Sequence, residues 1–227
     1  MSTKILELKD VTSTSRGFCL KNINLTIEAG YIYGLMGVNG AGKTTLMKTI
    51  MSENVKYAGH IFVQGENIKN NHAKIMNRIG FVSEDVAFFG ECSAIENARI
   101  LGSLYDEFDM ELFKSVMKKM NQSCGKVYGK MSRGEKLKFQ LAFAIAHKPC
   151  LYLLDEVTAG MDPVFRIEFF SILHELLIDE KAAILMTSHI ASEMETKADY
   201  IGIMKEGKLI QFGESLDIIP KLKEITK

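Results

Sequence analysis

The stretch "GVNGAGKT", residues 37–44, decides the fold of this chain. It follows the apolar run "YIYGLM" at 31–36 and leads into the helical pattern "KTTLMKTI" at 43–50. This order of strand, glycine loop and helix fits G-x-x-x-x-G-K-[ST]. The glycines let successive backbone N–H groups turn toward a phosphate chain, and the helix N-terminus adds the positive end of its dipole. A chance glycine turn is the alternative, but the spacing and its context predict a nucleotide-binding loop.

Individual positions of this loop have predictable roles. Lys43 is placed to reach the β- and γ-phosphates, and the Thr44 hydroxyl is placed to bind Mg²⁺. The residues that we expect to contact the nucleotide are Gly37, Asn39, Gly40, Ala41, Gly42, Lys43, Thr44 and Thr45.

The composition bounds the size and the partners of the protein. With 227 residues, 47% of them hydrophobic, the chain can bury one substantial core with a smaller lobe attached. Lys and Arg together number 28, and so do Asp and Glu, so no net basic charge attracts nucleic acid. Because the sequence also has no dense basic run, we expect no nucleic-acid partner.

Cysteine usage and hydropathy indicate the compartment. The cysteines stand far apart without C-x-x-C spacing, which is typical of free thiols in a reducing compartment and not of a metal site. The opening "MSTKILELKD" has no apolar segment of a signal peptide, and no apolar stretch approaches the ~20 residues of a membrane span. We therefore expect a cytoplasmic chain that does not itself cross a bilayer.

The pattern of apolar residues changes twice along the chain. Residues 4–36 contain short alternating runs typical of strands, whereas residues 91–147 carry apolar side chains at helical spacings. After Pro149, strand and helix patterns alternate as in a parallel sheet. We expect an α/β fold with a mixed sheet core, an N-terminal antiparallel β subdomain and an inserted helical lobe.

A second chemical pattern is "CLYLLDEVTAGMD", residues 150–162. Its apolar strand ends in Asp155 and Glu156, which places two carboxylates at the same edge of the sheet as the glycine loop. Asp155 is predicted to hold Mg²⁺, directly or through water, and Glu156 to orient or deprotonate the water that attacks the γ-phosphate. The alternative is an acidic strand end without a catalytic role.

The run "AAILMTSH" delivers His189 to this edge in the same way. A lone histidine after a strand is often structural. Here its distance in sequence from the acidic pair favours contact with the γ-phosphate.

The glycine loop, "LLDE", "AGMD" and "TSH", in this order and spacing, resemble the ATP-binding subunit of an ABC transporter over nearly the whole chain. The resemblance implies a P-loop NTPase of ABC type that hydrolyses ATP to ADP and phosphate with Mg²⁺. It implies one ATPase domain over 1–227, with its core at 1–84 and 149–227 and the helical lobe at 85–148.

The segment "YGKMSRGEKLKFQLAFAIAHKP", residues 128–149, resembles the ABC signature, usually written LSGGQ. At the five signature positions this chain has Met131, Ser132, Arg133, Gly134 and Glu135. The resemblance implies a head-to-tail homodimer or heterodimer in which Ser132 and Gly134 of one subunit close over ATP bound by Lys43 of the other. Locally, "SRGE" also predicts a capping box between Ser132 and Glu135, which is compatible with that role.

Two positions depart from the family pattern. Glu84 stands where a glutamine usually contacts Mg²⁺ and the attacking water, and a carboxylate there could still make a water-mediated metal contact. Where many members stack adenine on an aromatic residue, this chain has Ser15 or a neighbour, and Phe18 is the only ring nearby. Phe18 is a candidate for the adenine contact, with a core position as the alternative.

Phe88 and Phe89 stand together in "DVAFFGECS", a segment that otherwise has the composition of a loop. Adjacent rings on a loop between lobes suggest a docking groove, which in transporters of this family receives a helix of the membrane subunit. The alternative is that both rings pack into the helical lobe.

Several stretches, including "SRGEKLKFQLAFAI", resemble bacterial exporters of drugs, lantibiotics and amphipathic peptides such as phenol-soluble modulins. The expected function is ATP-driven export of a drug, lipid or amphipathic peptide through a separate transmembrane permease, which would hold the chain at the inner face of the cell membrane. The alternative is a soluble ABC ATPase in iron–sulphur assembly or on the ribosome. A P-loop kinase or GTPase would lack the "SRGE" helix and "TSH".

Overall fold

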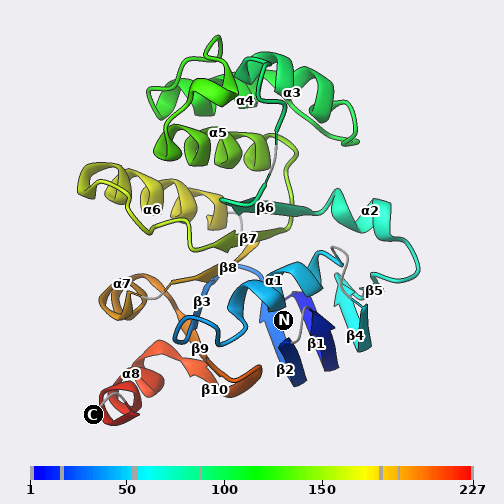
Figure 1. Cartoon of the computed structure of the whole chain (residues 1–227), viewed down its shortest axis with the longest axis vertical. Helices are drawn as coiled ribbons and strands as arrows, with labels where there is room; N and C mark the ends of the chain where they lie inside the picture. The colour runs from blue at the N-terminus through cyan, green and yellow to red at the C-terminus, as the bar shows by residue number, and fades with distance from the viewer. Residues whose placement is uncertain are drawn as a thin grey trace.

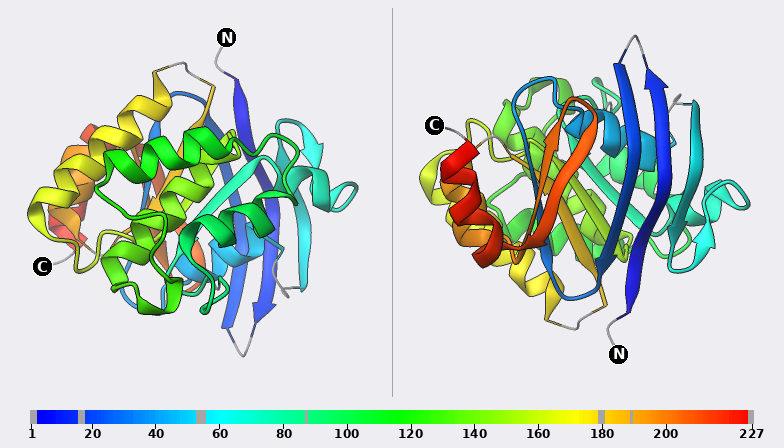
Figure 2. Two further views of the ribbon diagram at one scale, coloured as in Figure 1. Left: turned by 90° about the horizontal axis from the view of Figure 1, so that it is seen from above. Right: turned by 90° about the horizontal axis from the view of Figure 1, so that it is seen from below.

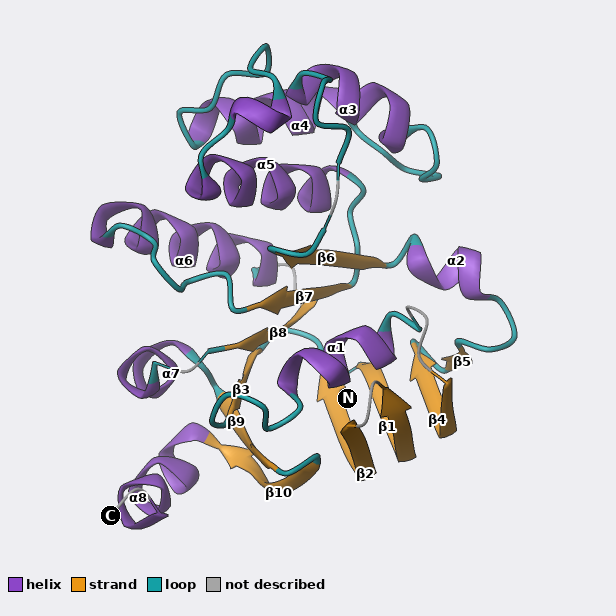
Figure 3. Ribbon diagram, in the orientation of Figure 1, coloured by secondary structure: helices purple, strands orange, loops and turns teal. Residues whose placement is uncertain are grey.

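Two β-sheets run through the molecule (Figures 1 and 3). The computed structural model describes residues 3–15, 18–52, 56–86, 88–178, 181–188 and 190–225. The first sheet is antiparallel, with the order β2 (Phe18–Glu28), β1 (Lys4–Ser15), β4 (Lys56–Val63) and β5 (Glu66–Asn67). The second has the order β10 (Lys208–Glu214), β9 (Tyr200–Lys205), β3 (Ile32–Met36), β8 (Ala183–Thr187), β7 (Leu151–Asp155) and β6 (Ile79–Ser83).

The second sheet is mixed. β10 pairs antiparallel with β9, whereas the pairs β9–β3, β3–β8, β8–β7 and β7–β6 are parallel. Together with the antiparallel first sheet, this topology confirms the predicted fold class.

Helices flank both sheets. They are α1 (Lys43–Ile50), α2 (His72–Met76), α3 (Ala94–Gly102), α4 (Met110–Lys119), α5 (Arg133–Ala146), α6 (Pro163–Leu177), α7 (Ala191–Lys197) and α8 (Ser215–Ile225), with a short 3-10 helix, η1, at Tyr128–Lys130. α3, α4 and α5 lie together beyond β6 at one end of the molecule (Figure 1), within the stretch 91–147 that the sequence predicts to be helical.

The central strands β3, β7 and β8 are buried along their whole length. Parallel strands covered on both faces have continuous apolar runs, and side chains alternate between the faces. Leu153 and Leu185 pack in the hydrophobic cluster with the first sheet and α1. Leu154 and Met186 pack in the cluster with α5 and α6. The second sheet is therefore the middle layer, as the views from above and below show (Figure 2).

Cap residues fix where two long helices begin. Asp162 accepts a hydrogen bond from the Phe165 N–H, and Pro163 occupies the first position of α6. At α5, Ser132 and Glu135 bond reciprocally to each other's backbone N–H, which confirms the predicted capping box.

The cysteines and the hydropathy of the helices can be compared with what the sequence predicts. Cys19, Cys92, Cys124 and Cys150 are free, as the sequence predicts. In the part of the chain that the structure describes, no helix combines the length and the apolar character needed to span a membrane.

Candidate nucleotide site

The carboxyl ends of β3, β7 and β8 meet at one edge of the second sheet. Leu35 pairs with Thr187, and Thr187 pairs with Asp155, in parallel registers. β3 leads into the loop 37–42, and α1 begins at Lys43. In open α/β sheets, ligands bind at this edge. The topology therefore brings the glycine loop and the acidic pair together.

The glycine loop adopts the conformation that its glycines allow. The φ angle is +80° at Gly40 and +107° at Gly42, values that favour glycine. An added Cβ at Gly37 would lie 2.5 Å from the backbone oxygen of Met204. A cavity of about 450 Å³ opens here, lined by Phe18, Asn39, Gly40, Ala41, Gly42, Lys43, Thr44, Thr45 and Glu156. This glycine-loop cavity includes every predicted loop contact except Gly37.

Lys43 and Glu156 face one another in this cavity. Lys43 is only 4% exposed, and its Nζ donates hydrogen bonds to the carbonyl oxygens of Gly37, at 2.8 Å, and Val38, at 3.4 Å. Glu156 Oε1 lies 3.4 Å from Lys43 Nζ, and the glutamate side chain is 34% exposed. A buried cation thus lies beside a carboxylate that water can reach.

The backbone of Glu156 is in an unusual conformation. Its φ angle is +50°, in the left-handed region that residues other than glycine rarely adopt. Its N–H donates a 2.9 Å hydrogen bond to Thr187 Oγ1. Strained residues of this kind persist where their surroundings hold them, and they cluster at functional sites. The backbone therefore favours the catalytic interpretation of Glu156 over a plain strand end.

Asp155, the residue before Glu156, is buried. It accepts a 2.7 Å hydrogen bond from Thr187 Oγ1. Burial raises its pKa, and hydrogen bonds from the Thr187 and Thr44 hydroxyls oppose that rise. The Thr44 hydroxyl and the Asp155 carboxylate therefore lie together, as a shared metal site requires.

Glu84, the third predicted metal contact, directly follows β6, whose last residue, Ser83, pairs with Asp155. It does not line the glycine-loop cavity, and its carboxylate forms an ion pair with Arg133 at the start of α5. Both side chains are 51% exposed. Arg133 also lies against the loop after Glu156, because an added Cβ at Gly160 would be 3.0 Å from its Nη1. Two departures from the family pattern, far apart in sequence, thus contact each other.

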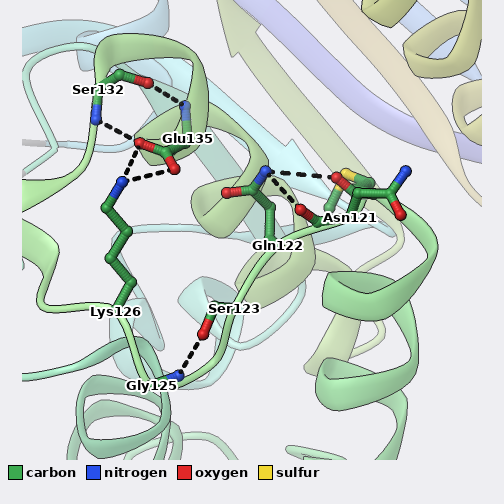
Figure 4. A network of polar contacts seen from close by, with 8 residues as sticks. Asn121, Gln122, Ser123, Gly125, Lys126, Ser132 and Glu135 are labelled. Atoms are coloured by element: carbon green, nitrogen blue, oxygen red, sulfur yellow. Dashed lines mark hydrogen bonds and ion pairs between the residues drawn. The ribbon is translucent and has the colours of Figure 1, made fainter.

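The start of α5 does not line the glycine-loop cavity of its own chain. Ser132 is exposed, and an added Cβ at Gly134 would meet no atom within 4 Å. The Ser132 N–H donates to Glu135, and Lys126 pairs with the same carboxylate at 2.7 Å (Figure 4). Hydrogen bonds from Lys126, then from the Ser132 N–H, lower the pKa of Glu135 to about 2. This turn is held rigidly while Ser132 and Gly134 stay accessible.

The two adjacent phenylalanines separate. Phe88 packs against Phe139 and Phe143, with ring centroids 4.7 and 5.3 Å apart, so the alternative of packing into the helical lobe holds for this ring. Phe89 is 49% exposed. A second cavity of about 490 Å³, the lobe cavity, is lined by Glu84, Asp85, Val86, Phe88, Gly90, Tyr128, Gly129, Arg133, Lys136, Leu137 and Gln140.

Two further predicted positions have mixed outcomes. Phe18 lines the glycine-loop cavity, and its ring lies against Gly42, where an added Cβ would be 2.7 Å from it. The same ring is partly buried against the second hydrophobic cluster, so it has both the cavity position and the core contact that the sequence suggests. His189 lies outside the described residues, and so does the side chain of Ser15.

Sequence reasoning missed Thr187 and Glu193. Thr187 bridges Asp155 and the Glu156 N–H, and the available signal was a hydroxyl at the end of the buried strand "AILMT". Glu193 is a buried carboxylate in α7 that bonds to Thr158 and Ser188. No local pattern distinguishes it from an exposed glutamate of a helix.

The chain is similar to proteins named as ATP-binding subunits of ABC transporters. A family model described as ABC transporter matches residues 20–159. A bacitracin transport ATP-binding protein of Bacillus licheniformis is 35% identical over 194 residues, which cover 84% of this chain and 63% of the relative. A lantibiotic transport ATP-binding protein of Streptococcus pyogenes is 31% identical over 208 residues, which cover 91% of this chain and 88% of the relative.

The fold has a counterpart among solved structures. The ATP-binding subunit of an ABC transporter superposes with a TM-score of 0.87 at 22% identity, covering 96% of this chain and 93% of that one. The chain spans less than two thirds of the length of the bacitracin relative. The family model matches more than half of the residues of this chain, so the chain belongs to the ABC transporter family as an ATP-binding domain.

Proposed function

We propose that this chain hydrolyses ATP and that Glu156 activates the attacking water. The observation that carries the proposal is the 3.4 Å approach of Lys43 Nζ and Glu156 Oε1 in the glycine-loop cavity. The Lys43 ammonium lies where it can bind the β- and γ-phosphates of ATP. Glu156 is partly exposed and can accept a proton from water there. In the sequence, His189 comes two residues after the end of β8, and this spacing supports a contact with the γ-phosphate.

Mg²⁺ fits the oxygen donors at this edge. The Thr44 hydroxyl is close enough to the Asp155 carboxylate to lower its pKa, and both are hard ligands of the kind that Mg²⁺ prefers. We propose that they hold the ion, which would neutralise phosphate charge when bound. The ion pair of Glu84 with Arg133 supports a water-mediated contact for Glu84 over direct coordination.

Glu84→Gln is expected to lower the KM for Mg·ATP by about two- to fivefold, because it removes a negative charge near the phosphates that is worth up to about 1 kcal/mol at an exposed position. The measurement is steady-state phosphate release at several ATP concentrations and two salt concentrations, since salt screens such a charge. Asp85→Asn, at the neighbouring exposed carboxylate, is the matched control. An unchanged KM at low salt would contradict an electrostatic role for Glu84.

We propose that a second chain completes the ATP site. Ser132 and Gly134 begin a helix whose N-terminus attracts anions, and neither residue lines the glycine-loop cavity of its own chain. A two-fold dimer of identical or related chains would place them over the partner's ATP in both sites at once. In this arrangement 1–227 is one ATPase domain, with its core at 1–84 and 149–227 and its helical lobe at 85–148.

The lobe cavity and Phe89 support docking of a membrane subunit. The cavity lies between the loop after β6 and the start of α5, so a segment bound there would contact Glu84 and Arg133 together. Asn97 holds the loop in place, because it accepts from the Phe89 N–H at 2.9 Å and donates to the Phe89 oxygen at 3.0 Å. The exposed Phe89 ring therefore projects from a fixed backbone.

Phe89→Ser is expected to uncouple the ATPase from the membrane subunit while the chain keeps its own ATP affinity. The ring is half exposed, so its loss removes a docking contact with little effect on folding. Phe88→Ser is the contrasting variant, because it removes a ring packed in an aromatic cluster and should therefore lower the melting temperature. The measurements are ATP affinity, melting temperature and stimulation of turnover by the membrane chain. Loss of ATP binding in Phe89→Ser would overturn the docking role.

The relatives named as bacitracin and lantibiotic transport proteins support export as the use of this ATPase. We propose that the chain powers export of a drug, lipid or amphipathic peptide through a separate permease, which holds it at the inner face of the membrane. The test is ATP turnover of the purified chain with membrane proteins copurified from its host and identified by mass spectrometry. A polytopic partner that changes turnover is the expected result. A soluble complex without one would contradict export and leave the ATPase proposal standing.

A further inference from the structure

A buried carboxylate that the proposed chemistry does not use lies between two segments of the site. Glu193 in α7 is 6% exposed. Its Oε2 accepts a 2.6 Å hydrogen bond from Thr158 Oγ1 and a 3.0 Å hydrogen bond from Ser188 Oγ. Thr158 lies two residues after Glu156, and Ser188 directly follows β8. One carboxylate thus joins the loop after β7 to the end of β8.

A second bridge between the same two strand ends lies next to the first. Thr187 Oγ1 donates to Asp155 and accepts from the Glu156 N–H. Thr158 and Thr187 are both fully buried. Glu156 is therefore the partly exposed residue between two anchored positions, Asp155 before it and Thr158 after it. The two anchored positions stabilise the left-handed backbone of Glu156, because a strained conformation of this kind persists only where its surroundings hold it.

Arg166 of α6 compensates the buried charge of Glu193. Its Nε lies 3.6 Å from Glu193 Oε1, and its Nη2 donates to the carbonyl oxygens of Thr158, at 3.4 Å, and Met161, at 3.3 Å. A buried carboxylate without such a partner would be costly. Arg166 therefore contacts both the carboxylate of Glu193 and the backbone of the segment 158–161.

We infer that Glu193 is a positioning residue for ATP hydrolysis: it holds Thr158 and Ser188 so that the Glu156 carboxylate stays at the attacking water. This inference rests on the proposed role of Glu156. Glu193 is not among the residues that line the glycine-loop cavity. It therefore acts by holding Thr158 and not by contacting ATP. A displacement of about 1 Å at a reacting group can cost 100-fold in rate, and a freed loop after Glu156 would allow such a displacement.

Thr158→Val is the sharpest test, because valine keeps the shape of threonine and removes only the hydroxyl that binds Glu193. We expect kcat to fall by about 10- to 100-fold, while the KM and the affinity for ATP change less than about twofold. Thr158→Ser, which retains the hydroxyl, should restore most of kcat. Glu193→Gln should lower kcat in the same way, and Glu195→Gln, at the other glutamate in α7 after Glu193, is the matched control.

The readouts separate positioning from folding. Turnover is divided by the number of ATP-binding sites counted in each sample, so unfolded chains do not enter kcat. A normal kcat per site in Thr158→Val, with only a lower melting temperature, would overturn the inference and assign Glu193 a structural role. If Glu193→Gln does not fold, Thr158→Val and Thr158→Ser still decide. Absence of turnover in the wild-type chain would instead overturn the proposed ATPase function.

Discussion

Glu156→Gln is expected to lower ATP turnover by at least about 100-fold, because a general base contributes 10²–10⁴-fold and glutamine cannot accept the proton. Glutamine has nearly the same shape and removes only the negative charge that lies 3.4 Å from Lys43 Nζ. ATP binding should therefore persist. Since the site would close and not reopen by hydrolysis, the variant should accumulate as an ATP-bound dimer.

The measurements for Glu156→Gln are phosphate release and the molecular mass in solution with and without Mg·ATP. Glu168→Gln, in α6, is the matched control and should behave like the wild type. Turnover at the wild-type rate would show that another group activates the water. Loss of ATP binding would mean that the substitution damages the glycine loop.

The second large effect is expected for Lys43→Ala. Charged hydrogen bonds contribute about 1.5–3 kcal/mol each, so losing the ammonium should weaken ATP binding by about 10- to 100-fold and reduce turnover further. The measurement is ATP affinity by calorimetry, with melting temperature as the check on folding, because Lys43 is buried and bonds to two loop carbonyls.

Lys43→Arg is the informative control for this position. It keeps the positive charge but not the compact ammonium that fits between the carbonyl oxygens of Gly37 and Val38. We expect it to bind ATP better than Lys43→Ala and worse than the wild type. An affinity of Lys43→Ala within threefold of the wild type would contradict the assigned role of the glycine loop.

Much of the fold could be predicted because its signals are local. The glycine loop, the buried strand "LYLLD" and the capping box of Ser132 with Glu135 each depend on neighbouring residues, and the structure has all three. Even the meeting of Asp155 with the glycine loop follows from a general property of parallel sheets, whose carboxyl ends share one edge.

The contacts that could not be predicted join residues far apart in sequence. The sequence shows that Glu84 and Arg133 each depart from a family pattern. That the two side chains form an ion pair is seen only in the structure. Phe88 and Phe89 are adjacent and have the same side chain, but their environments differ. The Phe88 ring packs against aromatic side chains of α5, whereas the Phe89 ring is half exposed. The exposure of a ring depends on packing that a short motif does not encode.

The most direct test of a composite ATP site is how turnover depends on the concentration of the chain. If Ser132 of one chain closes over ATP bound by Lys43 of another, two chains must meet for each hydrolysis, so phosphate release per chain should rise with concentration and then level off. The purified chain is assayed with saturating Mg·ATP over a wide range of dilution. Turnover per chain that stays constant across the range, in a chain that remains monomeric, would contradict the two-chain site.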